Sequence, residues 1–568
     1  MNTVIIPESL RPLTPILQLY LDSLLCWFSQ YVYDRLLAKA QEHELYRLQS
    51  CLDVGPIVRV CGDYHHRTGP GRKPVHTVPR LVRALVVKYV YGYSLRQLEQ
   101  QLRFNLLVKW FVGYEVFAAS PDHNTLHNFE RYLYSHHPRL YFDTVLKQID
   151  EQFPCQRRQS QIGDTFALRA DAALEGMIER IRHTGCRLLW AIRAVDEERY
   201  ELLQAARYVT YLLGQEEVKP VYYLSADEWQ DRLEYTIKAV LLVQQMVGPA
   251  SSDPAVATWL SYLEKLLQDE LALDLDEYDR LLGVALLPEE KRGSYRICSA
   301  TDPEATIRNH GPGKQDFGYN ISITATPDFI REVRADTGSQ PDAVAIPDLL
   351  QAQRDHHNLC PPKLIYDQAA GTGKAAIAVT QVSQGQTQLV AKPMPLPTHH
   401  PCFLPQDFSL SADEQTLTCP AGRLSDRRSI NSSGGHTFRF ATSMCTGCHL
   451  LLECRGHSEP PITPRQVLIS STYVPYQQLL TYSQTPAFKQ DMKLRPHIER
   501  VIAGLVRHNG ARRARFRGLA KVDFQVKMCA MAYNIKRWIK QLPSQIPHYR
   551  MAIDKNTSLL LGTGAPNG

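Results

Sequence analysis

The sequence predicts an α/β fold: a mixed sheet with flanking helices, a helical N-terminal region, a helical insertion and a small Cys-rich β insertion. Two observations predict it. Short stretches of apolar and β-forming residues lie in the middle of the chain, with helical patterns between them. Two long segments of different composition interrupt these stretches, one rich in Leu, Glu, Gln and Arg and the other in Pro and Cys. At 568 residues the chain is long enough for several folded units.

The strands of the α/β layer are expected in three places. A segment of β-forming residues surrounds Asp164, a second spans residues 317–326, and a third spans residues 363–368. A helix is expected at residues 341–355, between the second and third strands. Residues 176–292 contain few glycines and are interpreted as a helical insertion into this layer.

The N-terminal region is expected to be helical. Residues 17–25 place Leu and Tyr on one helical face, which is typical of a helix that faces a core. Residues 81–102 predict two helices broken at Gly92, with Ser94 as the N-cap of the second. A third helix is expected to begin near Asp122. Three short helices after a basic arm suit a DNA-binding or dimerising unit, and they suit an ordinary helical subdomain equally well.

These patterns divide the chain into five expected parts. They are a helical DNA-binding or dimerisation region at 1–155; a catalytic core made of 156–175, 293–395 and 476–545; a helical insertion at 176–292; a Cys-rich, zinc-binding insertion at 396–475; and a flexible tail at 546–568.

Positive charge is unevenly distributed along the chain. The formal net charge is only +6, but the segment from Lys489 to Lys540 holds fourteen Lys or Arg against three acidic residues. Such a segment is typical of a nucleic-acid-binding surface, and a solvated helix face is the alternative. The candidate phosphate contacts are Arg72, Lys73, Arg495, Arg507, Arg512, Arg513, Arg515, Arg517 and Lys521.

Composition argues against a secreted or membrane protein. The N-terminus has no secretory signal pattern, and no run of about 18 apolar residues occurs in the sequence. Thirteen cysteines, most of them scattered singly, do not resemble a disulfide framework. We therefore expect a cytoplasmic, nucleoid-associated protein without a membrane partner.

Three acidic residues are candidates for a metal-dependent active site. Asp164 lies in an expected strand, and Asp367 follows the apolar run at the end of another. Glu499 lies at the margin of the apolar stripe of an expected helix, with Arg495 one turn earlier. Taken singly, each acid is more often a surface charge than a ligand. Together they offer the oxygen donors that Mg²⁺ prefers, and two such ions can promote displacement at phosphorus.

Four cysteines form a second candidate site. Cys445 and Cys448 have Cys-x-x-Cys spacing, with Cys419 before them and Cys454 after them. Four thiolates make a closed tetrahedral zinc site of the kind that braces a small fold. Unrelated reduced thiols are the alternative. Three histidines are further candidates for one ligand position: His436, His449 and His457.

One glycine-rich motif is not interpreted as a nucleotide site. Gly371-Thr-Gly-Lys374 resembles part of a phosphate-binding loop, but the full pattern requires a glycine at Gln368 and Ser or Thr at Ala375. The two glycines are instead expected to make the turn after the strand that bears Asp367.

Four stretches of the sequence carry a resemblance to a known family. They are residues 71–113 with 121–129, residues 163–174, residues 301–323 and residues 495–538. They resemble the DDE transposases of bacterial insertion sequences, and most closely the IS eleven-eighty-two-like group among the IS-four and IS-five relatives. The last stretch is the most specific, because it joins an Arg-x-x-x-Glu helix to a basic Arg-Phe-Arg-Gly-Leu segment and a closing helix.

The resemblance implies a ribonuclease H-like catalytic fold and an enzyme that cleaves and joins DNA at the terminal inverted repeats of a mobile element. It implies that Asp164, Asp367 and Glu499 are catalytic acids that hold two Mg²⁺ or Mn²⁺ ions, with Arg495 beside the glutamate. Asp171 is an alternative first acid. The implied partners are terminal-repeat DNA and target DNA, with a dimer or higher assembly on DNA.

The sequence departs from the pattern of the wider family at two positions. Met492 stands where a tyrosine is usual, and Val506 stands where a lysine is usual, with Arg507 beside it. These departures leave room for a catalytically inactive DNA-binding relative, and a nuclease that cuts without joining is a further alternative. All three acids are present, which favours the enzyme.

Overall fold

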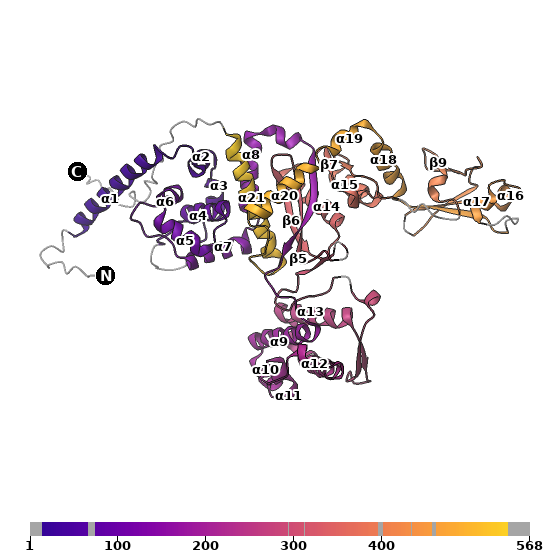
Figure 1. Ribbon diagram of the computed structural model, residues 1–568, viewed down its shortest axis with the longest axis horizontal. Helices are drawn as coiled ribbons and strands as arrows, with labels where there is room; N and C mark the ends of the chain where they lie inside the picture. The colour runs from indigo at the N-terminus through magenta and orange to yellow at the C-terminus, as the bar shows by residue number, and fades with distance from the viewer. Residues whose placement is uncertain are drawn as a thin grey trace, which may run out of the picture.

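The computed structural model describes residues 14–65, 74–293, 295–309, 311, 313–395, 402–432, 434–456 and 462–542. Figure 1 shows a helical N-terminal region, a central sheet with helices, a helical unit beneath the sheet and a narrow arm that extends away from it. The prediction of a mixed α/β fold with a helical N-terminal region and a mixed sheet is confirmed. The domain boundaries stay predictions, and the expected tail at 546–568 lies outside the described residues.

Helices fill the N-terminal region. α4 ends at Gly92, which has a left-handed φ of 72°, and Ser94 forms a capping box at the start of α5. Asp122 caps α7 by accepting a hydrogen bond from the amide of Thr125. These three expectations are confirmed. The bounds are α1 Thr14–Leu37, α2 Glu44–Cys51, α3 Gly55–Val60, α4 Val78–Tyr91, α5 Leu95–Phe104, α6 Leu106–Val112, α7 His123–His136 and α8 Leu140–Gln152.

The first helix departs from its expected role. Tyr20 and Leu24 in α1 are 72% and 59% exposed, so the expectation that their face joins the core is wrong. α1 carries apolar residues around most of its circumference, and only its C-terminal part reaches the rest of the region. There Tyr33 is buried, and its hydroxyl donates a hydrogen bond of 2.7 Å to the carbonyl of Tyr114.

The central sheet combines antiparallel and parallel pairs. Its strands follow the order β4-β5-β1-β7-β8, and β6 also pairs with β5. β1 is antiparallel to β5 and parallel to β7, which is in turn parallel to β8. The bounds are β1 Gln161–Arg169, β4 Thr306–Asn309, β5 Gln315–Ala325, β6 Ile330–Thr337, β7 Lys363–Ile365 and β8 Gln388–Val390.

Helices from the second half of the chain pack around this sheet. A helix was predicted at 341–355; α14 begins at Ile346 and ends at His357, two residues beyond the predicted end. The bounds are α14 Ile346–His357, α15 Gly373–Ser383, α18 Tyr473–Ser483, α19 Pro486–Met492, α20 Pro496–His508 and α21 Leu519–Gln541.

Helix α21 joins the N-terminal region to the sheet. It contacts α8 and α4 on one side and β6 on the other, and most of its residues are buried. Polar side chains on this helix bond to the backbone of the edge strand β6. Asn534 accepts from the amide of Ile330 at 2.8 Å and donates to its carbonyl at 2.9 Å, and Lys527 donates to the carbonyl of Val333. α21 thus covers an edge that would otherwise be open to other strands.

Two further units extend from the core (Figure 1). The helical unit has its own buried cluster, which includes Leu188 and Ile237, and it ends in a β-hairpin that the sequence did not predict. Its bounds are α9 Met177–Val195, α10 Glu197–Gln204, α11 Arg207–Leu212, α12 Ala226–Met246, α13 Pro254–Glu270, β2 Leu271–Leu275 and β3 Leu281–Leu286. The bounds of the arm are β9 Ser409–Leu410, β10 Leu417–Thr418, β11 Arg427–Ile430, β12 His436–Phe440, α16 Thr442–Cys445, α17 Leu451–Arg455 and β13 Arg465–Ile469.

Candidate active site

The register of β1 and β7 brings two of the predicted acids to the same level. Ile162 lies opposite Ile365 in this parallel pair. Asp164 lies two residues further along β1, and Asp367 lies two residues beyond Ile365, just after the end of β7, where it caps a short 3-10 helix. Both aspartates therefore lie near the same end of the β1–β7 pair. Asp367 also acts electrostatically on Asp164.

The ring of Tyr366 lies directly against β1 at Gly163, the residue before Asp164. A Cβ atom at Gly163 would be only 1.9 Å from Cε2 of Tyr366, so the close approach requires glycine. Tyr366 is buried, and its hydroxyl has no hydrogen-bond partner among the described residues. Burial raises the pKa of Tyr366, and Asp164 and Asp367 raise it further.

Helix α20 carries the third predicted acid to the sheet. Its expected apolar stripe is confirmed, because Ile498, Val501 and Leu505 are buried. Arg495, at the start of the helix, donates a hydrogen bond of 2.9 Å from Nη2 to Oδ2 of Asp164. Glu499 lies four residues later, one helical turn away, and is exposed.

Asp164 is subject to opposing influences. Burial raises its pKa above the ordinary value and Asp367 raises it further, while Arg495 and the amide of Thr165 lower it; the net change is a rise. That amide donates to Oδ1 of Asp164 at 2.8 Å. Nη1 of Arg495 is also buried and has no hydrogen-bond partner in the described part of the chain.

The donor chemistry suits a hard divalent ion, although the side chains are not gathered around one. Among the residues that the structure describes, no three His, Cys, Asp or Glu side chains are grouped so that they could hold a metal ion. Asp164 and Asp367 lie on adjacent segments, and Glu499 lies on the helix that packs across β1. Carboxylate oxygens at such a place are the ligands that Mg²⁺ prefers.

The alternative first acid and the two departures from the family pattern lie elsewhere. Asp171 follows the other end of β1, where it pairs with Arg513 at 3.6 Å and with Arg517 at 3.9 Å. Met492 and Val506 are partly buried and pack against the main hydrophobic core. Neither position offers a polar group to the acids.

Sequence reasoning missed a polar cluster beside Asp164. Arg308 in β4 is buried, and its Nη2 donates to Oγ1 of Thr165 at 2.7 Å and to Asp342 at 3.2 Å. Asn320 also donates to Asp342, at 2.9 Å. This cluster fixes the residue next to Asp164. No motif marks it, because its members come from four separate segments of the chain.

The basic loop, residues 511–521, lies along the far end of β1. The carbonyl of Arg512 accepts from the amide of Arg169 at 3.3 Å, and the amide of Ala514 donates to the carbonyl of Arg169 at 2.8 Å. Ala511 and Ala514 are buried, while the cations between and after them are exposed: Arg512, Arg513, Arg515, Arg517 and Lys521. Arg169 lies five positions after Asp164 in β1, a span of roughly 17 Å.

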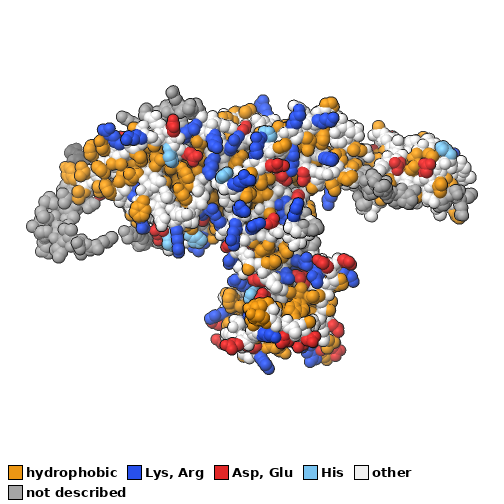
Figure 2. All heavy atoms as spheres, viewed as in Figure 1, with side chains coloured by type: hydrophobic (Ala, Val, Ile, Leu, Met, Phe, Trp, Pro, Cys, Tyr) orange, Lys and Arg blue, Asp and Glu red, His pale blue; other side chains and the backbone are white. Residues whose placement is uncertain are grey.

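Figure 2 shows Lys and Arg side chains gathered over the central part of the molecule, where Figure 1 places α20 and α21. Acidic side chains are more frequent at the far end of the helical unit (Figure 2). Arg507 is exposed near the end of α20. The predicted contacts Arg72 and Lys73 lie outside the described residues.

The two glycines of the Gly371-Thr-Gly-Lys374 motif allow close backbone contacts after the segment that bears Asp367. A Cβ at Gly371 would be 1.9 Å from the carbonyl oxygen of Lys392, and one at Gly373 would be 2.0 Å from that of Thr472. The motif therefore has a packing role.

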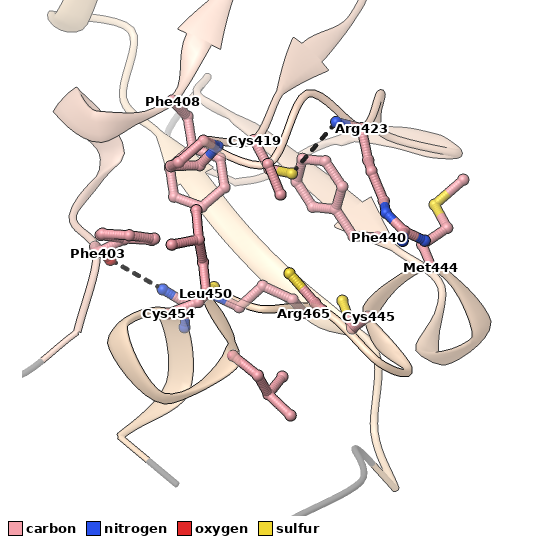
Figure 3. A pocket seen from close by; sticks show the side chains of 14 residues that line it. Phe403, Phe408, Cys419, Arg423, Phe440, Met444, Cys445, Leu450, Cys454 and Arg465 are labelled. Carbon is pink, nitrogen blue, oxygen red and sulfur yellow. Dashed lines mark hydrogen bonds between the residues drawn. The ribbon is translucent and has the colours of Figure 1, made fainter. Parts of the chain in front are cut away.

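The four predicted cysteine ligands lie together in the arm. Cys419, Cys445, Cys448 and Cys454 line one pocket, which Figure 3 shows.

Comparison with known proteins gives two family matches. Residues 34–131 match a transposase domain (DUF772), and residues 418–539 match a transposase DDE domain. No curated protein and no solved structure matches the chain. The two matches support a DDE transposase family. The second spans the four cysteines, Glu499 and the basic loop, whereas Asp164 and Asp367 precede it.

None of the described helices is sufficiently long and apolar to cross a membrane.

Proposed function

We propose that this chain is a DNA transposase that uses divalent metal ions to cleave and join strands at the terminal inverted repeats of an insertion sequence. One observation carries the proposal: Asp164 and Asp367 lie at the same level on adjacent parallel segments, and Arg495 ties the Glu499 helix to Asp164. The matches to two transposase domains point in the same direction.

The proposed catalytic fold is ribonuclease H-like. The sheet supports this assignment, because antiparallel strands β5 and β6 lie on one side of β1 and parallel strands β7 and β8 lie on the other. The finer assignment to the IS eleven-eighty-two-like group rests on the four stretches of sequence that resemble it.

The three carboxylates would hold two Mg²⁺ or Mn²⁺ ions. When bound, such ions activate the attacking oxygen and stabilise the leaving oxygen of an in-line displacement at phosphorus. Arg495 orients Asp164 through its hydrogen bond. The Thr165 amide fixes the other oxygen of Asp164. With this arrangement one site can use water to nick DNA and a freed 3′-hydroxyl to join it.

The basic loop would hold the DNA backbone beside this site. Its exposed cations sit on backbone that is anchored to β1, so the charges have a defined position relative to Asp164. Release of counterions from the phosphates would drive binding. Two ends of one element must meet for joining, so we expect a dimer or higher assembly on DNA.

The proposal is tested with labelled duplexes that carry the terminal repeats of the element, incubated with Mg²⁺ or Mn²⁺. We expect the wild-type protein to cleave the duplex at the repeat end, and Asp164→Asn, Asp367→Asn and Glu499→Gln to bind DNA without cleaving it. Asp171→Asn is the matched control, because Asp171 is an acid on the same chain segment but away from Asp367. Cleavage that survives in Asp367→Asn refutes the assigned site.

Joining is measured separately with duplexes that are already cut at the repeat end. Transfer of these ends into a target plasmid supports the transposase. Cleavage without transfer indicates a nuclease, and binding without either reaction indicates a catalytically inactive relative. The apolar Met492 and Val506 are the features that favour the inactive relative.

A further inference from the structure

Four thiols that are distant from the acids meet in one pocket of the arm. Cys419 follows β10, Cys445 ends α16, Cys448 lies in the next turn, and Cys454 lies in α17. Figure 3 shows the side chains of Cys419, Cys445 and Cys454 entering the pocket from different segments. All four side chains carry free thiols.

Two tight turns present the first cysteines to this pocket. Gly422 and Gly447 have left-handed φ values of 76° and 72°, which favour glycine. The amide of Gly422 donates to the carbonyl of Cys419 at 2.8 Å, and the amide of Arg423 donates to Sγ of Cys419 at 3.4 Å.

The surroundings of the thiols suit a soft, closed metal site. No carboxylate or imidazole is among the described residues that line the pocket, and three phenylalanines line it beside the cysteines: Phe403, Phe408 and Phe440. Arg423 and Arg465 line it as well. Four thiolates around a divalent ion leave two negative charges, and two arginines can offset them. Thiolate sulfur selects zinc over magnesium, and four sulfur ligands fill a tetrahedral zinc site, so no position is left for a reacting water.

The alternative histidine ligands are less well placed. Nε2 of His436 accepts from Arg428 at 2.7 Å, and neither His436 nor His449 lines the pocket. His457 lies outside the described residues. The four cysteines are therefore the better ligand set.

We infer that Cys419, Cys445, Cys448 and Cys454 bind one zinc ion as thiolates and that this ion braces the arm. The arm needs such a brace because its buried core is small, consisting of Phe408, Leu417, Phe438, Phe440, Val467 and Ile469. No three potential ligands of the described chain are grouped at metal-holding geometry. Binding therefore draws the turns at Gly422 and Gly447 toward Cys454, to Zn–S distances of about 2.3 Å.

The brace acts on the arm and leaves the core intact. The chain enters the arm after β8 and returns to the core at α18. The segment after β8 and helix α18 contact each other directly, and no residue of the arm takes part in these contacts. The hydroxyl of Tyr476 donates to the carbonyl of Met394 at 2.7 Å, and Thr472 lies against Gly373. Removal of zinc should therefore unfold the arm while the sheet that bears Asp164 and Asp367 stays folded. This inference does not depend on the proposed function, because it concerns metal content and folding.

The test uses the full-length protein, purified from zinc-supplemented medium without chelator. We expect mass spectrometry of the metal content to find one zinc per chain. Cys445→Ser and Cys448→Ser should each reduce zinc to background. Two control variants should retain it: Cys155→Ser, at an exposed cysteine outside the arm, and Cys402→Ser, at a cysteine close to Gly456 in the arm but outside the assigned four.

A second measurement remains informative if a serine variant misfolds. Zinc-free wild-type protein is titrated with Co²⁺, and the ligand-field bands of tetrahedral thiolate coordination should saturate at one ion per chain. Limited proteolysis after chelation should cut within residues 402–470 and spare the core. Wild-type protein that carries reduced thiols but no zinc, or zinc that is lost in Cys402→Ser and retained in Cys448→Ser, would overturn the assignment.

Discussion

Arg495 and Asp164 are 331 residues apart in the chain, yet Nη2 of the arginine donates a hydrogen bond of 2.9 Å to Oδ2 of the aspartate. Both side chains are largely buried. This contact links the central strand of the sheet to the helix that carries Glu499, and it orients Asp164.

Replacement of Arg495 should impair catalysis more than DNA binding. Arg495→Gln removes a charged donor that is already in position at the acids, and loss of such a donor typically costs a factor on the order of 10² to 10³ in rate. Strand cleavage should fall by about this factor, while DNA affinity in a filter-binding assay should change little. Arg500→Gln is the control, because Arg500 lies on the same helix but is exposed and donates to His497. Equal losses in both variants would contradict the assigned role of Arg495.

Substitution of Gly163 should disturb the two aspartates through Tyr366. Gly163→Ala places a Cβ 1.9 Å from the tyrosine ring, and overpacking of this kind typically costs about 1–3 kcal/mol. We expect a lower unfolding temperature in calorimetry together with slower cleavage. Gly283→Ala is the matched control, since a Cβ at this strand glycine meets no atom within 4 Å. The packing argument fails if both variants melt at the same temperature.

An ionic cluster should make the docking of the N-terminal region sensitive to acid. Asp143 in α8 accepts hydrogen bonds from Arg139 and from His357 in α14. Burial would raise the pKa of Asp143, but the contacts with His357 and Arg139 outweigh burial and lower it. A carboxyl whose pKa is lowered by folding stabilises the folded protein at pH values above its ordinary pKa of about 4. This contribution to stability is lost as the pH falls through the pKa of the folded state.

Asp143→Asn should therefore destabilise the protein at pH 7 by about 2 kcal/mol, the usual contribution of hydrogen bonds between charged groups. The difference from wild type should begin to shrink below about pH 4 and should disappear as the pH falls through the lowered pKa of Asp143 in the folded protein. Thermal unfolding of both proteins across this range measures the effect. Asp355→Asn, at an exposed position of α14, should cause no comparable loss at any pH. A constant difference between Asp143→Asn and wild type would exclude the titration.

Local signals in the sequence predicted the local features of the fold well. Ser94 and Asp122 cap helices because their side chains bond to nearby amides, and such contacts depend on only a few neighbouring residues. The β-forming residues around Asp164 likewise predicted a strand, and the spacing of apolar residues predicted the buried stripe of α20. The exposure of α1 was not, because spacing shows which residues share a face but not whether another element covers it.

The candidate site depends on relationships that one-dimensional patterns do not encode. Asp164 and Asp367 lie close to each other only because β1 pairs with β7. The sequence of neither strand indicates which strand it pairs with. The buried Arg308 was missed for the same reason, since its partners Thr165 and Asp342 are remote in sequence. The edge strand β6 was also missed, although it receives the polar side chains of α21.

The basic loop should contribute a salt-dependent part of DNA binding. Arg512 and Arg513 are exposed on backbone that is anchored to Arg169, so each can contact a phosphate without distorting the core. For B-DNA the logarithm of affinity falls with the logarithm of salt concentration, with a slope of about −0.9 for each neutralised phosphate. Arg512→Gln with Arg513→Gln should therefore make this slope less negative by about 1.8, and should weaken binding most at low salt.

Fluorescence anisotropy with duplex DNA at several salt concentrations measures the slope. The control removes two exposed cations of the helical unit, Lys238→Gln with Lys291→Gln, and should leave the slope unchanged. Equal slopes for the loop variant and the wild type would place the DNA on another surface.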